Sequence, residues 1–391
     1  MNIFNSLGSN YTFKEALKIL FIPNLPYYKT NLVKTLEEKY SGKAHLTYKG
    51  REALSLALSL IDTRRKKVAI NGFTCYAVYE PIEKAGFNAV LIDIDKETLN
   101  FSPESLENLA KRENLAAVVI QNTLGFPCDI SKIQKICKEY KIILIEDLAH
   151  SVGTVYENGK EAGTVGDIIV LSFSQDKMID AVSGGAVVIR NKDLIKDMFI
   201  KKNQTEKLRD RIYPFLSVSI RILYPYLIGK VFHFILKKLN VLSTPMDGYV
   251  IPTTSLLWQC HLAQIEFDRL NKNIAHRRLI VDIYFKNISE SLLNINLKKN
   301  NNSSFLRFPI FVKNRKGLIE FLKKEGIYVS DIWYDAPIAP HRFLSQTGYR
   351  GECPNAEMTS QTILNLPTHK NVSKAEAEKL SEIINQWEKL Q

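Results

Sequence analysis

AAVVIQNTLGFPCDISKIQKICKEYKIILIEDL, residues 116–148, sets the fold class of this chain. Its two apolar runs, 116–122 and 142–148, consist largely of Val, Ile and Leu, as strands do when a sheet is covered on both faces. Between them, residues 129–141 repeat apolar side chains at helical spacing, and Asp129 stands where an N-cap is expected. Because a helix joins the two runs, they are expected to be parallel strands of one sheet.

The same alternation continues in both directions, from about residue 45 to residue 190. The other strand-like runs lie at 68–71, 89–94, 167–174 and 185–190, and the other helical patterns lie at 50–61, 76–86 and 102–112, the last with Ser102 as its N-cap. Apolar strands joined by amphipathic helices predict an α/β fold with a mostly parallel sheet flanked by helices. Ligands of such sheets bind at the carboxyl ends of the strands.

In residues 246–391 the order of strand-like and helical patterns differs from the regular alternation of residues 45–190, which predicts a smaller α+β domain. We expect one long helix at 255–287, a strand at 305–312, and helices at 316–325 and 373–390, the last capped by Ser373. The chain as a whole is predicted to have four parts: an N-terminal arm at 1–44, a large α/β domain at 45–199, a basic hydrophobic helical insertion at 200–245, and the small C-terminal domain at 246–391.

Composition and charge narrow the functional class. The 391 residues are 45% hydrophobic and 24% charged, as in a globular protein, and the five cysteines form no CxxC pair. This cysteine usage predicts a cytoplasmic protein without a disulfide framework and without a structural metal. The net charge is +12, and residues 200–240 hold nine Lys or Arg and two acids, so an anionic partner is expected. No nucleic-acid-binding motif is recognisable, so the partner is not predicted to be a nucleic acid.

Three residues suggest a ligand site when they are considered together. Lys177 lies in a short loop between two predicted strands, Asp147 ends another strand, and Gly50 opens a helix. Each alone has an ordinary explanation: a surface lysine, a cap or salt bridge, and a common helix start. Together they supply an amine for a Schiff base, an acid for a pyridine nitrogen, and a helix N-terminus for a phosphate.

The order and spacing of several motifs resemble a known family. These motifs are KGREALSLAL (49–58), QNTLGFPCDI (121–130), IEDLAHSVGTVY (145–156), AGTVGDIIVLSFSQDK (162–177), SGGAVV (183–188) and LNLPTH (364–369). From about residue 48 to residue 391, apart from 200–250, the chain resembles the DegT/StrS family of pyridoxal-phosphate-dependent sugar aminotransferases. The resemblance implies the type I fold of aspartate aminotransferase, with pyridoxal 5′-phosphate as cofactor.

The resemblance also implies a role for each matching residue. Lys177 would bond to the cofactor aldehyde and then shuttle protons, Asp147 would pair with the protonated pyridine nitrogen, and His150 would lie near the ring hydroxyl. The implied cofactor-binding positions are Gly50, Arg51, Glu52, Cys75, Tyr76, Asp147, His150, Ser172 and Lys177. Gly50, Arg51 and Ser172 fall at the phosphate, although the family usually has Thr or Ser in place of Arg51. Cys75 stands where many members stack an aromatic ring, which Tyr76 could replace.

The implied reaction is a transamination, because this chain has the lysine at position 177. Some relatives with histidine at this position are dehydratases instead. An amino acid, glutamate, would donate the amino group to a keto sugar linked to a nucleotide, in polysaccharide or glycoconjugate synthesis. Trp333, Tyr334, His341 and Arg342 are the candidate substrate contacts. The family implies a homodimer. Its members usually carry, in the loop before the long helix, an asparagine that reaches into the active site of the partner subunit, but no asparagine is found in 248–259. The alternative function is a regulatory protein that binds the cofactor without turnover.

The segment 212–239 is the least similar to the family. It is apolar and aromatic, with basic residues in its middle and at its end, and it is interrupted by Pro214 and Pro225. The interior charges and Pro225 argue against a membrane span. Two interpretations fit: a helix hairpin that lies on an anionic membrane, at the inner face, or a helical flap that packs on the dimer or over the active site.

Overall fold

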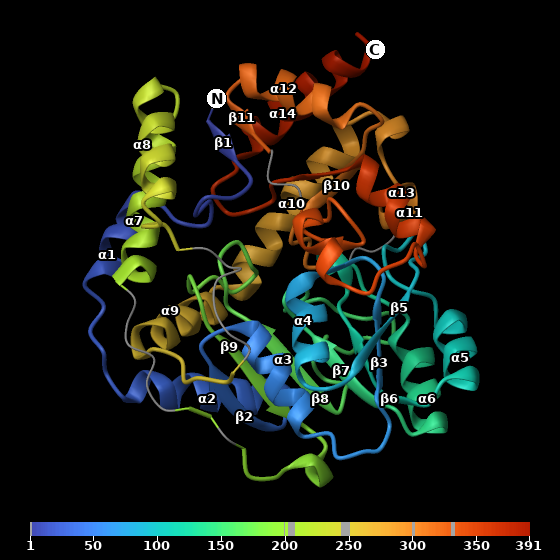
Figure 1. Ribbon diagram of the computed structural model, residues 1–391. Helices are drawn as coiled ribbons and strands as arrows, with labels where there is room; N and C mark the ends of the chain where they lie inside the picture. Colours follow the sequence, from blue (N-terminus) through green and yellow to red (C-terminus); the bar gives the residue numbers. More distant parts are fainter. Residues whose placement is uncertain (1, 199, 202–207, 244–250, 299–301, 330–332) are drawn as a thin grey trace.

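The computed structural model describes residues 2–198, 200–201, 208–243, 251–298, 302–329 and 333–391. Its centre is a seven-stranded sheet (Figure 1). In spatial order the strands are β2 (Lys43–Thr47), β9 (Gly185–Ile189), β8 (Ile168–Ser172), β7 (Ile143–Asp147), β6 (Leu115–Ile120), β3 (Lys67–Asn71) and β5 (Asn88–Ile92). The five strands from β8 to β5 are parallel, whereas β9 is antiparallel to both β8 and β2. The predicted α/β fold with a mostly parallel sheet is therefore confirmed.

Helices cover both faces of this sheet, which explains why its strands are apolar throughout. These helices are α2 (Tyr27–Tyr40), α3 (Gly50–Ser59), α4 (Tyr76–Lys84), α5 (Pro103–Arg112) and α6 (Ile130–Tyr140). Val68 and Ile70 of β3 share a core with α3 and α4, while Ala69 points into the core that contains residues of α2, α5 and α6. The predicted N-caps Ser102 and Asp129 accept hydrogen bonds from the N–H groups of Ser105 and Lys132.

The predicted helix at 255–287 is wrong in one respect, because the structure breaks it in two. α9 (Leu257–Asp268) and α10 (Leu270–Asn287) meet at Arg269, whose φ of −95° and ψ of −2° depart from regular helix geometry. The break has a packing reason. α9 buries side chains in the core beneath the sheet, whereas the second half of α10 packs in the core of the C-terminal part. Apolar spacing alone runs through Arg269 without interruption.

The C-terminal part has its own small sheet and its own core (Figure 1). Its elements are α11 (Ile295–Lys298), β10 (Phe308–Phe311), α12 (Arg315–Lys324), β11 (Ile327–Tyr328), β12 (Ile338–Ala339), α13 (Pro354–Thr362), β13 (Ile363–Leu366) and α14 (Lys374–Glu388). β10 pairs antiparallel with β13, and α14 begins at Ser373 with a capping box, as expected. β12 pairs with β4 (Thr74–Cys75), which brings the loop 333–342 beside Cys75.

The N-terminal residues pack against the rest of the protein. β1 (Ile3–Phe4) pairs with β11 of the C-terminal part, and α1 (Phe13–Leu20) and α2 contribute to the core beneath the sheet. The proposed boundary between residues 44 and 45 falls inside β2, whose edge pairing with β9 begins at Lys43. The division into four parts otherwise stays a prediction.

The described part of the insertion is helical. α7 (Leu208–Leu223) and α8 (Leu227–Lys238) form an antiparallel pair, with Pro214 inside α7 and Pro225 in the turn. α7 packs against α1, and α8 stands at the edge of the molecule (Figure 1). Among the described residues, no helix combines the length and apolar character that crossing a membrane requires.

Candidate active site

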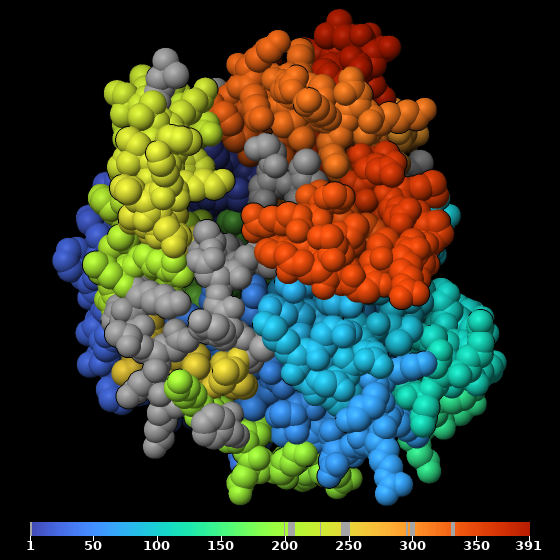
Figure 2. Space-filling model, in the orientation of Figure 1, coloured from blue at the N-terminus to red at the C-terminus, as the bar shows by residue number. Residues whose placement is uncertain are grey.

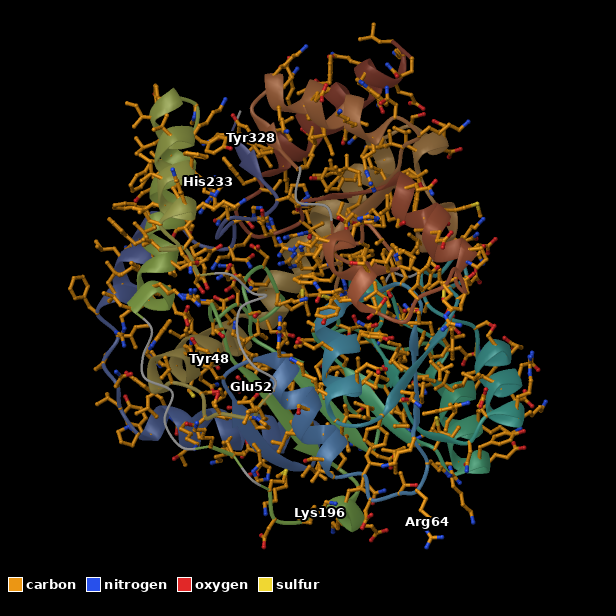
Figure 3. All side chains as sticks on the ribbon, in the orientation of Figure 1. Tyr48, Glu52, Arg64, Lys196, His233 and Tyr328 are labelled. Carbon is orange, nitrogen blue, oxygen red and sulfur yellow. The ribbon has the colours of Figure 1, made fainter. Side chains whose placement is uncertain are left out.

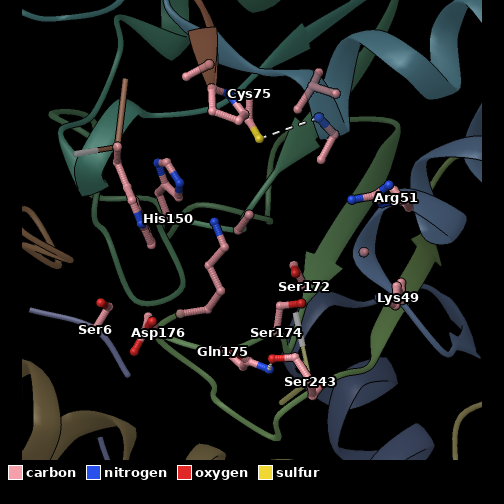
Figure 4. Close-up of a pocket in the computed structure, with 18 of the residues that line it drawn as sticks. Ser6, Lys49, Arg51, Cys75, His150, Ser172, Ser174, Gln175, Asp176 and Ser243 are labelled. Carbon is pink, nitrogen blue, oxygen red and sulfur yellow. Dashed lines mark hydrogen bonds between the residues drawn. The ribbon is translucent and has the colours of Figure 1, made fainter. Parts of the chain in front are cut away.

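A cavity of about 590 Å³ lies at the carboxyl ends of the parallel strands, between the sheet, the loop 333–342 and α8. Figure 4 shows its wall, with side chains contributed by several separate segments. Of the residues predicted from the sequence, those that line it are Gly50, Arg51, Cys75, Asp147, His150, Ser172, Lys177, Trp333, Tyr334 and Arg342. Asp147 and Ser172 are the last residues of β7 and β8, so the strand ends gather these groups.

Lys177 sits in the loop after β8, with its ammonium group inside the cavity wall. Its Nζ atom lies 4.6 Å from the ring centroid of Trp333. Burial lowers the pKa of Lys177, and the charge of Arg307 lowers it further, while Cys75 and Asp147 oppose the shift. A lowered pKa leaves more of the amine neutral, which is the form that attacks a carbonyl group.

The loop that carries Lys177 is held by Asp180 and by the N-terminal segment. The Asp180 carboxylate accepts hydrogen bonds from the N–H groups of Asp176 (2.9 Å) and Val182 (3.0 Å) and from the Asn10 side chain (2.9 Å). The hydroxyl of Tyr11 donates to the same carboxylate. These bonds stabilise a backbone in which Asp176 has a φ of +63°, so they fix the approach of Lys177.

Asp147 is a buried carboxylate, 5% exposed, at the end of β7. One of its oxygens accepts a hydrogen bond from the N–H group of Ala149 at 2.9 Å. Burial raises the pKa of Asp147, whereas the Ala149 N–H group and the charge of Lys177 lower it. A buried carboxylate of this kind is stabilised by a cationic hydrogen-bond donor, which a protonated pyridine nitrogen supplies.

His150 is buried between the loop 333–342 and the turn after β6. Its Nδ1 atom accepts a hydrogen bond from the N–H group of Leu124 at 3.2 Å, so the proton of the neutral ring lies on Nε2. The ring stacks on Trp333 with centroids 5.3 Å apart, and the Tyr334 hydroxyl lies 3.2 Å from Nδ1. Burial lowers the pKa of His150 well below its usual value, as do Lys177 and Arg307. His150 is therefore a neutral ring at physiological pH.

The start of α3 provides a surface on which a phosphate fits. Gly50 is its first residue, and Lys49, at the N-cap, makes no side-chain capping bond. A Cβ atom on Gly50 would lie 2.6 Å from the Ser172 Cβ atom, so only glycine allows this approach. The open helix N-terminus beside a serine hydroxyl suits a phosphate group. Arg51 also lines the cavity, but its guanidinium forms an ion pair with Glu80 at 3.2 Å.

Three predicted residues, Glu52, Tyr76 and His341, do not line this cavity. Glu52 accepts hydrogen bonds from the N–H group (2.9 Å) and hydroxyl (2.8 Å) of Thr253, and burial raises its pKa to about 7. Figure 3 shows Glu52 near Tyr48 at the start of α3. Tyr76 stacks on Phe343, with centroids 4.7 Å apart, and His341 lies exposed in a helical turn. Glu52 therefore positions α3, and Tyr76 does not substitute for the aromatic ring at Cys75.

Cys75 itself faces the cavity, where its Sγ atom accepts the N–H group of Ala77 at 3.4 Å (Figure 4). The aromatic ring near Lys177 comes instead from Trp333, which also lies 5.0 Å from the Arg307 guanidinium. Trp333 was predicted as a substrate contact, and its stacking on His150 places it over the reactive amine.

Sequence reasoning missed other residues of the cavity wall. They are Ser6, Leu7, Lys49, Gln121, Ser174, Gln175, Asp176, Tyr213, His233, Lys237 and Ser243, among others. Gln121 had a detectable signal, because it directly follows the apolar strand β6 as Asp147 ends β7. The residues from α7, α8 and the N-terminal segment had none, because long-range packing brings them to the site.

An amine, a buried carboxylate and a glycine-lined phosphate surface fit pyridoxal 5′-phosphate. Lys177 would hold the cofactor aldehyde, Asp147 its pyridine nitrogen, and the start of α3 with Ser172 its phosphate. When bound there, the cofactor supplies an electron sink for cleavage of a C–H bond next to nitrogen.

The chain is similar to known aminotransferases. The family model for the DegT/DnrJ/EryC1/StrS aminotransferase family matches residues 30–215 and 257–385. A GDP-perosamine synthase of Vibrio cholerae is 28% identical over 301 residues, which cover 74% of this chain and 72% of that protein. UDP-4-amino-4,6-dideoxy-N-acetyl-beta-L-altrosamine transaminase of Campylobacter jejuni is 25% identical over 350 residues, 87% of this chain and 84% of that protein.

Solved structures confirm the type I fold. The crystal structure of DesV from S. venezuelae, in complex with a ketimine intermediate, superposes with a TM-score of 0.71 at 18% identity. The match covers 96% of this chain and 94% of DesV. This protein is therefore a member of the DegT/DnrJ/EryC1/StrS family of pyridoxal-phosphate-dependent aminotransferases.

Proposed function

We propose that this aminotransferase moves an amino group from an amino acid, glutamate, to a keto sugar linked to a nucleotide, in polysaccharide or glycoconjugate synthesis. The observation that carries the proposal is the convergence of Lys177 and Asp147 in one cavity of about 590 Å³. That volume accommodates a cofactor and a sugar together. Two curated relatives have names that contain a nucleoside diphosphate sugar, which supports this class of acceptor. The paired amine and carboxylate favour turnover over the regulatory alternative.

Each catalytic residue has a physical role in this proposal. Lys177, with its lowered pKa, accepts a proton as a neutral amine and returns it as an ammonium group. Asp147 would hold the pyridine nitrogen of the bound cofactor and keep it protonated. His150, neutral and packed against Trp333, fixes one face of the cofactor pocket and excludes water from it.

The acceptor sugar is proposed to contact the loop 333–342. Trp333, Tyr334 and Arg342 line the cavity, whereas His341 does not. Tyr334 has its hydroxyl near His150 and its ring on Phe73, with centroids 4.5 Å apart, so its position is fixed from two sides. Arg342 is the residue of this group that offers a permanent positive charge to an anionic part of the acceptor.

A two-stage assay tests the proposed reaction. With glutamate alone, the visible absorbance of the lysine-linked cofactor should fall as the cofactor gains the amino group. Adding a panel of nucleotide-linked 4-keto and 3-keto sugars should restore the absorbance for the true acceptor, with an amino sugar detected by mass spectrometry. Colour that glutamate never bleaches would favour the regulatory alternative instead.

The quaternary structure and the location are further parts of the proposal. We infer that the protein forms a homodimer in the cytoplasm, peripheral to the inner membrane face. The exposed side of α8 supports the membrane contact: Ile228, Val231 and Ile235 are 66%, 54% and 46% exposed and follow one another at helical spacing. α1, which packs on α7, and its C-cap Phe21 add exposed Phe13 and Phe21 with basic Lys14 and Lys18 between them. Apolar and basic side chains together suit an anionic lipid surface.

Vesicle flotation tests this contact. The wild-type protein should float with vesicles that contain phosphatidylglycerol. The triple variant Ile228→Ser, Val231→Ser, Ile235→Ser should lose at least about tenfold in binding, because each buried apolar side chain contributes roughly 1.5 kcal/mol or more. Three exposed apolar residues elsewhere provide the control variant Ile251→Ser, Met358→Ser, Leu390→Ser, which should float like wild type. The membrane contact is wrong if wild type stays unbound or if both variants float equally.

A further inference from the structure

α8 belongs to the wall of the catalytic cavity, although it comes from the segment that least resembles the family. His233 and Lys237 line the cavity from α8, and Tyr213 lines it from α7. The two α8 residues are four positions apart, so they lie on one side of the helix. Ile235 follows His233 by about half a helical turn, which places the exposed apolar residues on the other side of α8. One helix therefore presents a basic side to the cavity and an apolar side to the surroundings.

Figure 3 shows His233 on α8 well away from Glu52 at the start of α3. Since Gly50 and Ser172 form the phosphate surface at α3, His233 and Lys237 belong to a different region of the same cavity. In Figure 2, α8 rises as a ridge beside the C-terminal part. Lys237 lines the cavity and is also exposed to solvent. An anion that enters from solvent can reach these two residues without displacing the cofactor phosphate.

The cavity wall carries more positive than negative charge, which favours the binding of a second anion besides the cofactor phosphate. The described wall carries the basic residues Lys49, Lys177, Lys237 and Arg342 and the carboxylates Asp147 and Asp176, while Arg51 is neutralised by its ion pair with Glu80. Lys237 lowers the pKa of His233 after the larger effect of burial, so the two side chains are electrostatic neighbours. The cofactor phosphate would neutralise charge near α3, which leaves the positive charge at α8 for another ligand.

We propose that His233 and Lys237 bind the diphosphate group by which the acceptor sugar is joined to its carrier. This inference rests on the proposed function, because it assigns a subsite to the acceptor. An ammonium group is a compact charge with three donors, and an imidazole N–H adds a directed hydrogen bond, so the pair suits phosphate oxygens. The diphosphate then lies at the rim, and the sugar extends inward toward Lys177.

The carrier itself has two chemical sources, a nucleoside or a lipid, and both present the same diphosphate. The apolar side of α8 would lie close to the lipid chain in the second case, whereas a nucleoside would occupy the space near Tyr213 and Ser243 in the first. The shared chemistry is the diphosphate, and the carrier is decided by which ligand binds more tightly.

Calorimetric titration of the cofactor-loaded protein tests the subsite. The probes are inorganic pyrophosphate, UDP, GDP, dTDP and farnesyl diphosphate. We expect pyrophosphate to bind wild type, and Lys237→Ala and His233→Ala each to weaken it by about tenfold, with Lys237→Glu abolishing binding. Lys238→Ala, a neighbouring lysine outside the cavity wall, is the matched control and should bind like wild type.

The outcomes separate the inference from the proposed function. Tighter binding of a nucleoside diphosphate than of pyrophosphate assigns a nucleotide carrier, and tighter binding of farnesyl diphosphate assigns a lipid carrier. Binding that Lys237→Ala and Lys238→Ala weaken equally, or that neither weakens, overturns the subsite. The proposed function fails separately, if glutamate does not change the cofactor absorbance of the wild-type protein.

Discussion

Lys177→Ala should abolish the visible absorbance of protein-bound pyridoxal phosphate and lower transamination by about 10⁴-fold or more. The substitution removes the amine that joins the cofactor and the group that moves the proton, and a positioned proton-transfer group alone contributes up to about 10⁴-fold. Folding should survive, because burial disfavours the charged form of Lys177 and alanine removes that cost. Absorbance spectra, the rate of the glutamate half-reaction and the thermal midpoint measure these effects.

Lys192→Ala provides the control, since Lys192 is an exposed lysine in a turn beyond β9. This variant should keep the colour, the rate and the thermal midpoint of wild type. If Lys177→Ala retained wild-type turnover, another amine would have to be the cofactor-binding group. A colourless but unfolded variant is identified by its circular dichroism spectrum, and Lys177→Arg, which keeps the positive charge, then serves as the second test.

Asp147→Asn should leave some bound cofactor but lower the rate of the glutamate half-reaction by about 10²–10³-fold. The amide has nearly the same shape, so the hydrogen bond from Ala149 can persist, but the negative charge opposite the ring nitrogen is lost. Removing one electrostatic group that stabilises charge in the reaction costs about this much. The stability of the apo protein should not fall, because burial already disfavours the carboxylate at this position.

Asp62→Asn is the matched control for this substitution. Asp62 is an exposed carboxylate in the loop after α3, and its replacement should change neither the absorbance nor the rate. The Asp147 variant should also shift the absorbance of the bound cofactor, because the ring nitrogen loses its proton. Wild-type rates in Asp147→Asn would mean that the ring nitrogen is held by a different group.

The placement of Lys177 and Asp147 in one cavity was predictable because both positions follow from local patterns. Asp147 ends an apolar run and Lys177 follows one, and strand ends of a parallel sheet converge regardless of the other contacts. Gly50 was predictable for a similar reason, as the first residue of an amphipathic helix. Glu52 and Tyr76, which the family resemblance placed at the cofactor, do not line the cavity. Adjacent residues on a helix point in different directions, and the sequence does not say which one faces the ligand.

Long-range packing explains what the sequence could not predict. Asn10 and Tyr11 reach Asp180 across about 170 residues of chain, and Trp333 is brought over Lys177 by the pairing of β12 with β4. The break at Arg269 likewise depends on long-range packing, because the two ends of one continuous apolar pattern pack into two different hydrophobic cores. None of these contacts can be recognised from hydrophobic periodicity in the sequence, because each joins segments that are remote along the chain.

The amino-acid order alone determined the alternation of strands and helices, and with it the sheet whose strand ends hold Lys177 and Asp147. Hydrophobic periodicity is a local property, so it can be read without coordinates. Only the folded chain decided which ring covers the lysine, which segment holds its loop, and that α8 contributes to the cavity wall. Those features depend on the packing of surfaces in three dimensions, where side-chain shape rather than spacing selects the neighbour.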